Sequence, residues 1–266
     1  MIIIGILKAF YDGDLDCKKI IDFVRDLTII HVNADESLLL AVDSDGGIGS
    51  KEMDVVKVKD HEIGYFAARV PLMEVMAANA RPMLVVDALS VEMKNTGEGI
   101  IAGIKELLKE ADMPDLPITG STEENIPTSQ TGVGVVVLGI IDKRRWTIGS
   151  SARGDLVGVA GIPKSGPEHE VKASDVEILK LQDLQKLRNT SGVHDVLPVG
   201  SKGIDFESKE LAGAGGLFFE KLESEIDFQQ SGGPSTSVIF SAENKEILEK
   251  IRGQISAPVN IIGQLK

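Results

Sequence analysis

Apolar runs separated by polar turns predict the strands of the first half of the chain. Runs of strand-forming residues at 27–32 and 37–42 are typical of two strands that meet in a turn. Residues 83–91 form a continuous apolar run interrupted by one carboxylate, Asp87, which is the pattern of a strand covered on both faces. A further strand, punctuated by glycines, is predicted over residues 132–141.

Segments with helical spacing alternate with these strands. Residues 61–80 carry a dense apolar face and few β-branched side chains, and Pro71 within them marks a kink or a helix start. Residues 99–111 predict an amphipathic helix, and residues 116–125 predict a short strand that runs into a polar loop. This alternation indicates an α+β or α/β fold for the first half.

A charged break at residues 142–145 is our candidate domain boundary, which divides the chain into domains 1–142 and 143–266. Beyond it the pattern predicts a smaller α/β unit. Its strands are expected at residues 155–161, 193–199, 238–241 and 259–262, and its helices at 175–187, 205–222 and 243–252.

Composition narrows the classes of function. With 266 residues, 42% of them hydrophobic, the chain is long enough for two modest domains with their own cores. Its net charge of -13 argues against a nonspecific partner of nucleic acid or of an anionic membrane, because both require a cationic surface. Cys17 is the only cysteine, so no intramolecular disulfide can form, as in a cytoplasmic protein. Residues 1–7 are apolar but too short to span a membrane, and we expect no signal peptide. They are either a leading helix or strand, or an upstream start that adds little to the fold.

The residues best suited to bind metal or phosphate follow the apolar run that ends at Val42. Three carboxylates, Asp43, Asp45 and Asp54, lie in a glycine-rich stretch. Aspartate and glycine favour tight turns in any case. Carboxylates at a strand end also supply the oxygen ligands that Mg2+ prefers, and glycines allow backbone N–H groups to approach phosphate. The adjoining buried strand favours this functional interpretation.

Other charged residues have structural alternatives of the same kind. Lys51 is either a solvated surface lysine or a phosphate contact, although the stretch is not a Walker motif. Glu74 lies among apolar residues of a predicted helix, where an ion pair with Arg69 or Arg81, or a metal, would offset its desolvation. Asp87 requires a metal or a hydrogen-bond donor for the same reason.

Four separated segments occur in the order expected of the aminoimidazole ribonucleotide (AIR) synthase superfamily, which includes thiamine-monophosphate kinase, selenophosphate synthetase and a hydrogenase maturation factor. The run from Asp45 to Lys51 resembles the family's Asp-Gly-Val-Gly-Thr-Lys signature. Residues 80–82 and the following strand are similar to its Gly-Ala-x-Pro segment. Residues 120–122 stand where the family has Gly-Gly-Asp/Glu-Thr, and residues 154–155 with 165–167 resemble the opening of its second domain.

The resemblance implies a two-domain α+β subunit with a mixed N-terminal sheet that pairs across a homodimer, a shortened C-terminal domain, and a site for ATP, Mg2+ and a small-molecule substrate. The expected metal ligands are Asp43, Asp45, Glu74 and Asp87. The expected nucleotide contacts are Gly46, Gly47, Gly49, Ser50, Lys51, Gly120 and Thr122. Lys51 and Asp45 would carry the catalysis, and no membrane or nucleic acid is expected as a partner.

Departures from the family pattern favour a divergent kinase. The turn has one glycine more than the family signature, Ser121 replaces the usual acidic residue, and Glu74 stands where the family has a metal-binding aspartate. Residues 43–49 together with 199–204 are most similar to the alpha-ribazole kinase branch, which acts in cobalamin lower-ligand salvage. The alternatives are an AIR synthase-type ATP-dependent cyclo-ligase of purine biosynthesis, and a regulatory protein that binds nucleotide without turnover.

Overall fold

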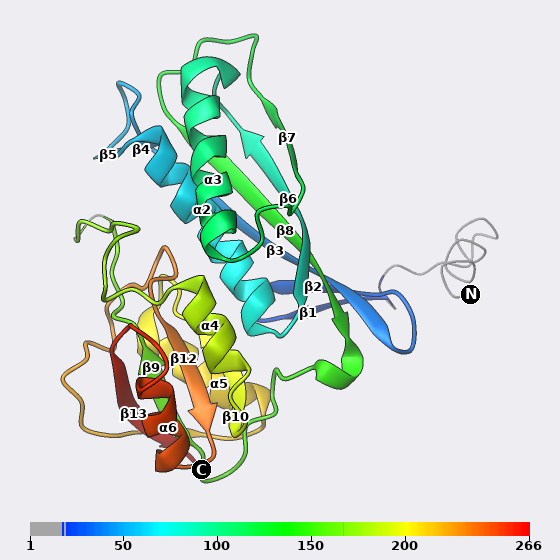
Figure 1. Cartoon of the computed structure of the whole chain (residues 1–266), viewed down its shortest axis with the longest axis vertical. Coiled ribbons are helices and arrows are strands. Elements are labelled where there is room, and N and C mark those ends of the chain that lie inside the picture. The colour runs from blue at the N-terminus through cyan, green and yellow to red at the C-terminus, as the bar shows by residue number, and fades with distance from the viewer. Residues whose placement is uncertain (1–17, 19, 167) are drawn as a thin grey trace.

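A computed structural model describes residue 18 and residues 20–266 apart from 167, so the helix or strand expected at residues 1–7 lies outside the described part. The first half forms a six-stranded sheet in the order β1-β2-β3-β8-β6-β7 (Figure 1). Only β6 and β7 pair in parallel, which confirms the predicted mixed sheet. The strands are β1 (Ile21–Val24), β2 (Leu27–His31), β3 (Glu36–Gly46), β6 (Arg81–Leu89), β7 (Ile118–Thr122) and β8 (Gly132–Asp142). A small parallel pair, β4 (Ile48–Gly49) and β5 (Val56–Lys57), stands beside it.

Two helices, α2 (Asp60–Ala77) and α3 (Glu98–Glu110), pack on one face of this sheet (Figure 1). Their backbones touch, because a Cβ atom at Gly64 would lie 1.9 Å from the carbonyl oxygen of Ile100. A Cβ atom at Gly103 would meet the carbonyl oxygen of His61 at the same distance. Pro71 lies inside α2, which runs on to Ala77.

The second half forms a five-stranded antiparallel sheet in the order β10-β12-β9-β13-β11. Its strands are β9 (Leu156–Ala160), β10 (Val193–Pro198), β11 (Phe219–Lys221), β12 (Val238–Ala242) and β13 (Val259–Leu265). Its helices are α4 (Leu181–Arg188), α5 (Gly203–Ala214) and α6 (Lys245–Arg252), and the short turns η2 (Met93–Gly97) and η3 (Lys143–Arg145) belong to the first half and the connection. No helix in the described part is long and apolar enough to cross a membrane.

Two helix predictions in the second half extended too far. The helix expected at 175–187 begins only at Leu181. The helix expected at 205–222 ends at Ala214, because Gly215 and Gly216 follow and Gly216 adopts a φ of 69°, a conformation that side chains disfavour. The chain then turns into β11, which pairs with β13.

The two halves share a core. β8 ends at Asp142, where the first of our two predicted domains ends. One cluster of buried apolar residues nevertheless joins Leu72 and Met73 of α2 to Leu184 of α4 and Val196 of β10. Burial of apolar surface between the halves therefore holds them together.

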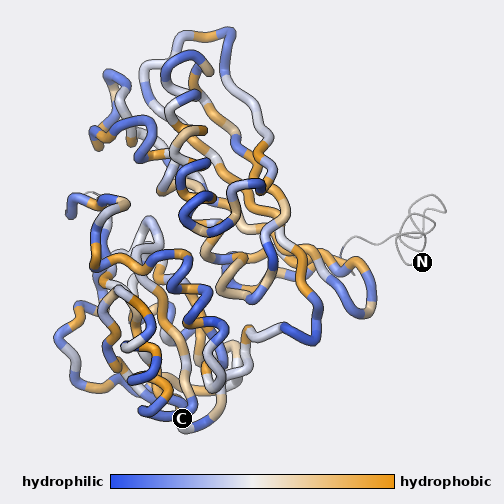
Figure 2. Tube along the Cα trace, in the orientation of Figure 1, coloured by the Kyte–Doolittle hydropathy of each residue, from blue (hydrophilic) through white to orange (hydrophobic). Residues whose placement is uncertain are grey.

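The sheet face opposite α2 and α3 is also apolar. The pairing register places Phe23, Thr28, Leu40, Leu138 and Leu84 in one row across five strands, from β1 to β6. Phe23 is 77% exposed, and Val42, on the same face of β3, is 62% exposed. Figure 2 shows orange, apolar segments along the strands of the first sheet. Apolar side chains on an uncovered sheet face are typical of a surface that contacts a partner.

Candidate functional site

Predicted metal ligands lie on the helix-covered face of the first sheet. The pairing register aligns Asp43 of β3, Val135 of β8, Asp87 of β6 and Gly120 of β7 in one row. Because side chains alternate along a strand, Asp43 shares its face with the buried Ala41 and therefore points toward α2. Asp43 and Asp87 are thus at the same level of the sheet, with one strand between them.

Asp43 and Asp45 lie on the strand itself. The prediction that the buried strand gives way to a turn after Val42 was wrong, since β3 continues to Gly46. Burial raises the pKa of Asp43, and the negative charge of Asp26 adds to this rise against a hydrogen bond from the backbone of Ser44. Burial and the charge of Asp43 raise the pKa of Asp45 to about 6.

Glu74 projects from α2 and is buried, with 9% of its surface exposed. Burial raises its pKa well above the ordinary value, and the negative charges of Asp26 and Glu207 raise it further. The positive charge of Arg25 opposes this rise. An ion pair between Glu74 and Arg69 or Arg81, the structural alternative to metal binding, does not form in the described part of the protein.

We call the five carboxylates whose charges perturb one another the acidic cluster: Asp26, Asp43, Asp45, Glu74 and Glu207. Burial raises the pKa of Glu207 to about 7, and Asp26 contributes to that rise. Carboxylates held together with raised pKa values lack enough positive charge nearby. Their oxygens are the type of donor that a hard divalent cation such as Mg2+ takes, so the chemistry of these residues suits such a cation, although in this arrangement the described residues do not group closely enough to hold one.

Sequence reasoning missed Asp26 and Glu207. Asp26 lies in the two-residue turn between β1 and β2, and pairing of Leu27 with Ala41 brings this turn beside β3. Strand β1 was not predicted from the sequence, so no sequence pattern indicated a turn at Asp26. Glu207 comes from the first turns of α5 in the second half, and only the packing of the halves brings it to the cluster.

Asp87 stands apart from the acidic cluster. It is 4% exposed, and burial alone raises its pKa, with no carboxylate among the causes. Its side chain lies over Gly120, where a Cβ atom would come within 1.7 Å of Asp87 Oδ1. Among the described residues, no three acidic, histidine or cysteine side chains already form a closed metal-binding group.

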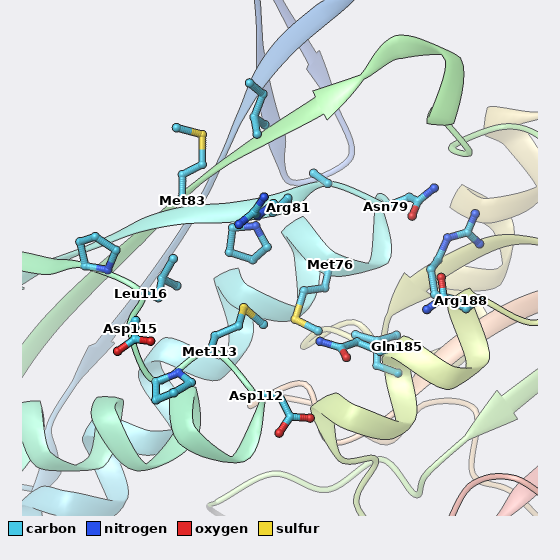
Figure 3. A pocket seen from close by; sticks show the side chains of 17 residues that line it. Met76, Asn79, Arg81, Met83, Asp112, Met113, Asp115, Leu116, Gln185 and Arg188 are labelled. Carbon is cyan, nitrogen blue, oxygen red and sulfur yellow. The ribbon is translucent and has the colours of Figure 1, made fainter.

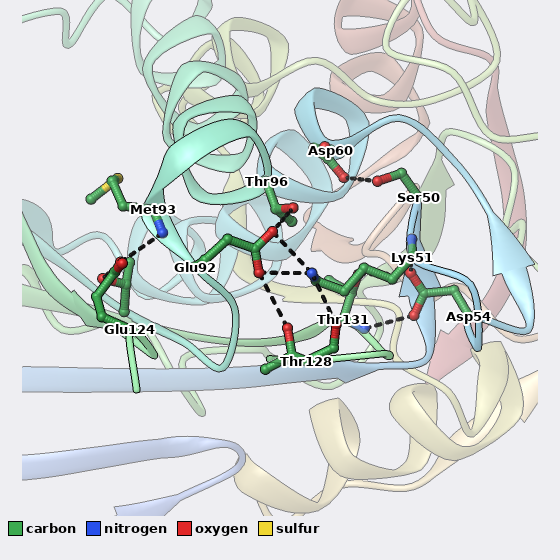
Figure 4. A network of polar contacts seen from close by, with 11 residues as sticks. Ser50, Lys51, Asp54, Asp60, Glu92, Met93, Thr96, Glu124, Thr128 and Thr131 are labelled. Carbon is green, nitrogen blue, oxygen red and sulfur yellow. Dashed lines mark hydrogen bonds and ion pairs between the residues drawn. The ribbon is translucent and has the colours of Figure 1, made fainter. Parts of the chain in front are cut away.

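The glycine turn after β3 is fixed by Asp54 (Figure 4). One oxygen of this buried carboxylate accepts from the backbone of Thr131 at 2.7 Å, and the other accepts from Thr131 Oγ1 at 2.7 Å and from the backbone of Lys51 at 2.9 Å. Burial would raise the pKa of Asp54, but these hydrogen bonds outweigh it and lower the pKa. Gly47, with a φ of 74°, and Gly49, with a φ of 152°, supply backbone conformations that favour glycine. Asp54 is therefore a structural residue of the turn.

Lys51 is held at the same end of the sheet by Glu92 (Figure 4). Its Nζ donates to both carboxylate oxygens of Glu92, at 2.7 and 3.0 Å, and to the carbonyl oxygen of Thr128 at 3.2 Å. Hydrogen bonds from Lys51 and Thr96 lower the pKa of Glu92 to about 2. Asp54, Lys51, Glu92 and their hydrogen-bond partners form what we call the loop network.

The remaining predicted nucleotide contacts gather at this end of the sheet. Strands β3 and β6 both run antiparallel to β8, and β7 is parallel to β6, so β3, β6 and β7 end at one edge. Ser50 Oγ donates to Asp60 Oδ1 at 2.7 Å, and Thr122 Oγ1 donates to Glu124 at 2.9 Å. Gly46 faces open space. The assigned roles of Gly46, Gly47, Gly49, Ser50, Gly120 and Thr122 stay predictions.

Two loops of the second half are joined to each other and to α2. The backbone N–H of Gly232 donates to the carbonyl oxygen of Gly200 at 3.0 Å. Arg69 of α2 is fully buried, and its Nε donates to the carbonyl oxygen of Ser235 at 3.1 Å, while Nη2 donates to that of Leu179. Helix α2 therefore contributes Glu74 to the acidic cluster and also holds the loop at residues 231–236.

Comparison with known proteins agrees with this architecture. Residues 25–141 match the family model described as AIR synthase related protein, N-terminal domain. No curated protein sequence matches the chain. A thiamine-monophosphate kinase from Stenotrophomonas maltophilia has a similar structure, with 16% identity, a TM-score of 0.62 and coverage of 98% of this chain and 92% of that one.

Two further similar structures were solved with ATP. Hydrogenase maturation protein HypE in complex with ATP is 15% identical, with a TM-score of 0.63 over 85% of this chain and 76% of that one. PurL from T. maritima complexed with ATP is 14% identical, with a TM-score of 0.62 over 92% of this chain and 42% of PurL. The family model thus matches the first half of the chain, and these structures show that the whole chain shares their fold.

Proposed function

We propose that the protein is a cytoplasmic ATP- and Mg2+-dependent kinase that phosphorylates a small nucleoside-like metabolite. The observation that carries this proposal is the acidic cluster, where carboxylates from both halves meet beside the glycine turn at the end of β3. Phosphoryl transfer requires mainly positioning and charge neutralisation, which this arrangement is suited to provide. Two similar structures, HypE and PurL, were solved with ATP, and the similar S. maltophilia protein is named a kinase. These similarities support the same proposal.

Each group has a role in this proposal. Asp43, Asp45 and Glu74, with Asp26 and Glu207, would hold Mg2+, which would supply positive charge to offset that of the phosphate. Asp87, one strand away from Asp43, remains our candidate for a further metal ligand.

The glycine turn and Lys51 contact phosphate. Gly46 faces open space, so a phosphate oxygen can approach the backbone there, whereas Gly47 and Gly49 shape the turn: the Gly47 N–H donates to the carbonyl oxygen of Thr131, and Gly49 packs against Thr131 and Asp54. Glu92 already forms an ion pair with the Lys51 ammonium at 2.7 Å. In this proposal the nucleotide therefore shares the ammonium with Glu92.

The acceptor approaches from the second half in this proposal. The loop at residues 231–236 carries hydroxyl groups on both sides of its glycines, and Arg69 fixes it relative to α2. Alpha-ribazole is our candidate acceptor because of the resemblance of residues 43–49 and 199–204 to that kinase branch.

We also propose that the apolar face of the first sheet pairs with a second copy of the chain. Phe23 and Val42 leave large apolar surfaces exposed there, which a homodimer would bury. Val42→Lys should yield a monomer in analytical ultracentrifugation. Val55→Lys, at an 84% exposed loop position, is the matched control and should leave the dimer intact. A monomeric parent protein would contradict the proposal.

The decisive experiment for the function is acceptor-dependent release of ADP. The protein is incubated with ATP and Mg2+, with and without hydroxyl-bearing nucleosides that include alpha-ribazole. We expect ADP only when an acceptor is present, and its loss in Asp45→Asn but not in Asp35→Asn, an exposed turn residue. ADP release coupled to ring closure of an amide-bearing ribonucleotide would instead indicate a cyclo-ligase. Tight ATP binding without acceptor-dependent turnover across a broad metabolite panel would indicate the regulatory protein.

A further inference from the structure

A cavity of about 830 Å3 opens between the two halves, away from the acidic cluster. It is lined by the end of α2, the start of β6, the loop between α3 and β7, and α4. Met76 of α2 lines it, whereas Glu74 faces the acidic cluster. Two residues along a helix correspond to a rotation of about 200°, so the cavity and the cluster lie on opposite sides of α2. The cavity is therefore not part of the site described above.

The wall of this cavity is mixed, and its apolar part is rich in methionine (Figure 3). Met76, Met83 and Met113 line it together with Leu184 of α4 and Pro82 of β6. Methionine side chains are flexible and polarizable, and they adapt to ligands of varied shape. The volume falls in the range of ligand pockets in proteins, which are mostly apolar and carry a few polar groups.

Two arginines line the same cavity without a carboxylate partner. The side chain of Arg81 is exposed and makes no hydrogen bond or ion pair with any described residue. The Arg188 guanidinium donates only to the carbonyl oxygen of His194, through both Nη atoms at 3.2 and 3.3 Å, and its Nε is buried without a partner. Asp195, the carboxylate near Arg188, already forms an ion pair with Arg25 at 2.5 Å. Unpaired arginines are notable in a chain whose net charge is -13.

We propose that this cavity is a second ligand site, which takes an amphipathic organic anion with an apolar, planar body and one carboxylate, sulfonate or phosphate group. The anionic group contacts Arg81 and Arg188, because a guanidinium offers a fork of donors that matches such planar or tetrahedral anions. The apolar body packs on Met76 and Met113. An occupant of this cavity contacts α2 and α4 together, so it bridges the two halves.

Two carboxylates restrict how the anion lies in the cavity. Asp112 accepts from Gln182 Nε2 at 3.1 Å, and Asp115 is exposed. Figure 3 shows Asp115 and Arg188 at opposite sides of the cavity. Repulsion from the aspartates therefore directs the anionic group toward the arginines, and the aspartates remain free to accept from hydroxyl or amine groups of the ligand.

The test compares two fluorescent molecules of similar shape, without ATP or Mg2+, so that its outcome is independent of the proposed kinase activity. 8-Anilinonaphthalene-1-sulfonate carries the anionic group, and N-phenyl-1-naphthylamine lacks it. In the full-length protein we expect Arg81→Gln with Arg188→Gln to weaken binding of the sulfonate by about tenfold or more. Binding of the neutral molecule should change less than about twofold, since the apolar wall is retained.

Three controls determine the interpretation. Arg153→Gln removes the same charge at an exposed position outside the cavity and should bind both molecules as the parent does. Arg81→Gln alone, at an exposed side chain, should still weaken sulfonate binding if the double variant fails to fold. Equal affinity of the parent and the Arg81 variant for the sulfonate would overturn the proposal. So would loss of sulfonate binding in Val42→Lys, since that would place the dye on the open sheet face.

Discussion

The acidic cluster and the loop network both concentrate charge at the first sheet, but in opposite electrostatic states. In the loop network every carboxylate is matched: Asp54 accepts three hydrogen bonds, and Glu92 accepts from Lys51, Thr96 and Thr128. Their pKa values are lowered. In the acidic cluster the pKa values of Asp45 and Glu74 are raised, because burial and like charges oppose ionisation.

This difference separates residues that hold the fold from residues to which we assign a ligand. A matched carboxylate stabilises the native protein, and its removal leaves donors unsatisfied. An unmatched buried carboxylate destabilises the native protein unless a cation or a proton joins it. Mutations of the two regions should therefore change stability in opposite directions.

The largest expected effect is on the loop network. Asp54→Ala removes three hydrogen bonds from a buried carboxylate, and the free energy of unfolding should fall by about 3 kcal/mol. Urea denaturation measures this change. Glu52→Ala, at an exposed position in the same loop, should change stability by less than about 0.5 kcal/mol. Equal stability of the two variants would show that Asp54 does not fix the turn.

The opposite sign is expected for Glu74→Gln. In metal-free protein at pH 8, above the ordinary pKa of a glutamate, this change removes the cost of either ionising the buried side chain or keeping it protonated, so the free energy of unfolding should rise by about 1 kcal/mol. Addition of Mg2+ should raise the melting temperature of the parent and have little effect on the variant. Glu246→Gln, at an exposed position on α6, is the control and should behave as the parent. Destabilisation of Glu74→Gln without metal would remove the contrast between the two regions.

The pH dependence should show the same contrast. Folding raises the pKa of Asp45 to about 6 and that of Glu207 to about 7, from ordinary values of 3.8 and 4.5. The native state therefore holds these protons more tightly, and their stabilising contribution is complete below about pH 4 and lost as the pH rises through 6 to 7. Metal-free protein should lose about 1 to 2 kcal/mol between pH 5 and pH 8 from these groups. A combined Asp45→Asn and Glu207→Gln variant should flatten this part of the profile, and an unchanged slope would contradict the assignment.

The smallest effect is expected for the ion pair of Lys51 with Glu92. Glu92→Gln weakens a partly exposed pair and should lower stability by about 1 kcal/mol or less, an effect that high salt reduces. Because folding lowers the pKa of Glu92 to about 2, its contribution is present above its ordinary pKa of 4.5 and is lost as the pH falls toward 2. Thermal unfolding from pH 7 to pH 2 measures this change. A contribution that persists at pH 2 would argue against it.

Local pattern predicted most of the first sheet and its helices, because alternation and helical spacing are strong over residues 27–42, 61–80 and 132–141. It placed Asp43 and Asp45 at the right end of the right strand, although it ended that strand too early. Asp26 and Glu207 could not be found in this way. Their positions depend on an unpredicted hairpin and on packing between the halves, which no local pattern records. The separation of Asp87 from the acidic cluster likewise depends on strand order.

Arg69 has a mechanical consequence for catalysis. Rotation of one half away from the other would break the hydrogen bonds from the buried Arg69 guanidinium to the carbonyl oxygens of Ser235 and Leu179, and would leave the guanidinium without these partners. Such a rotation is therefore costly, in contrast to enzymes that open and close by swinging domains about a hinge. In the proposed kinase, substrate would then enter and product would leave by movement of surface loops over a rigid frame.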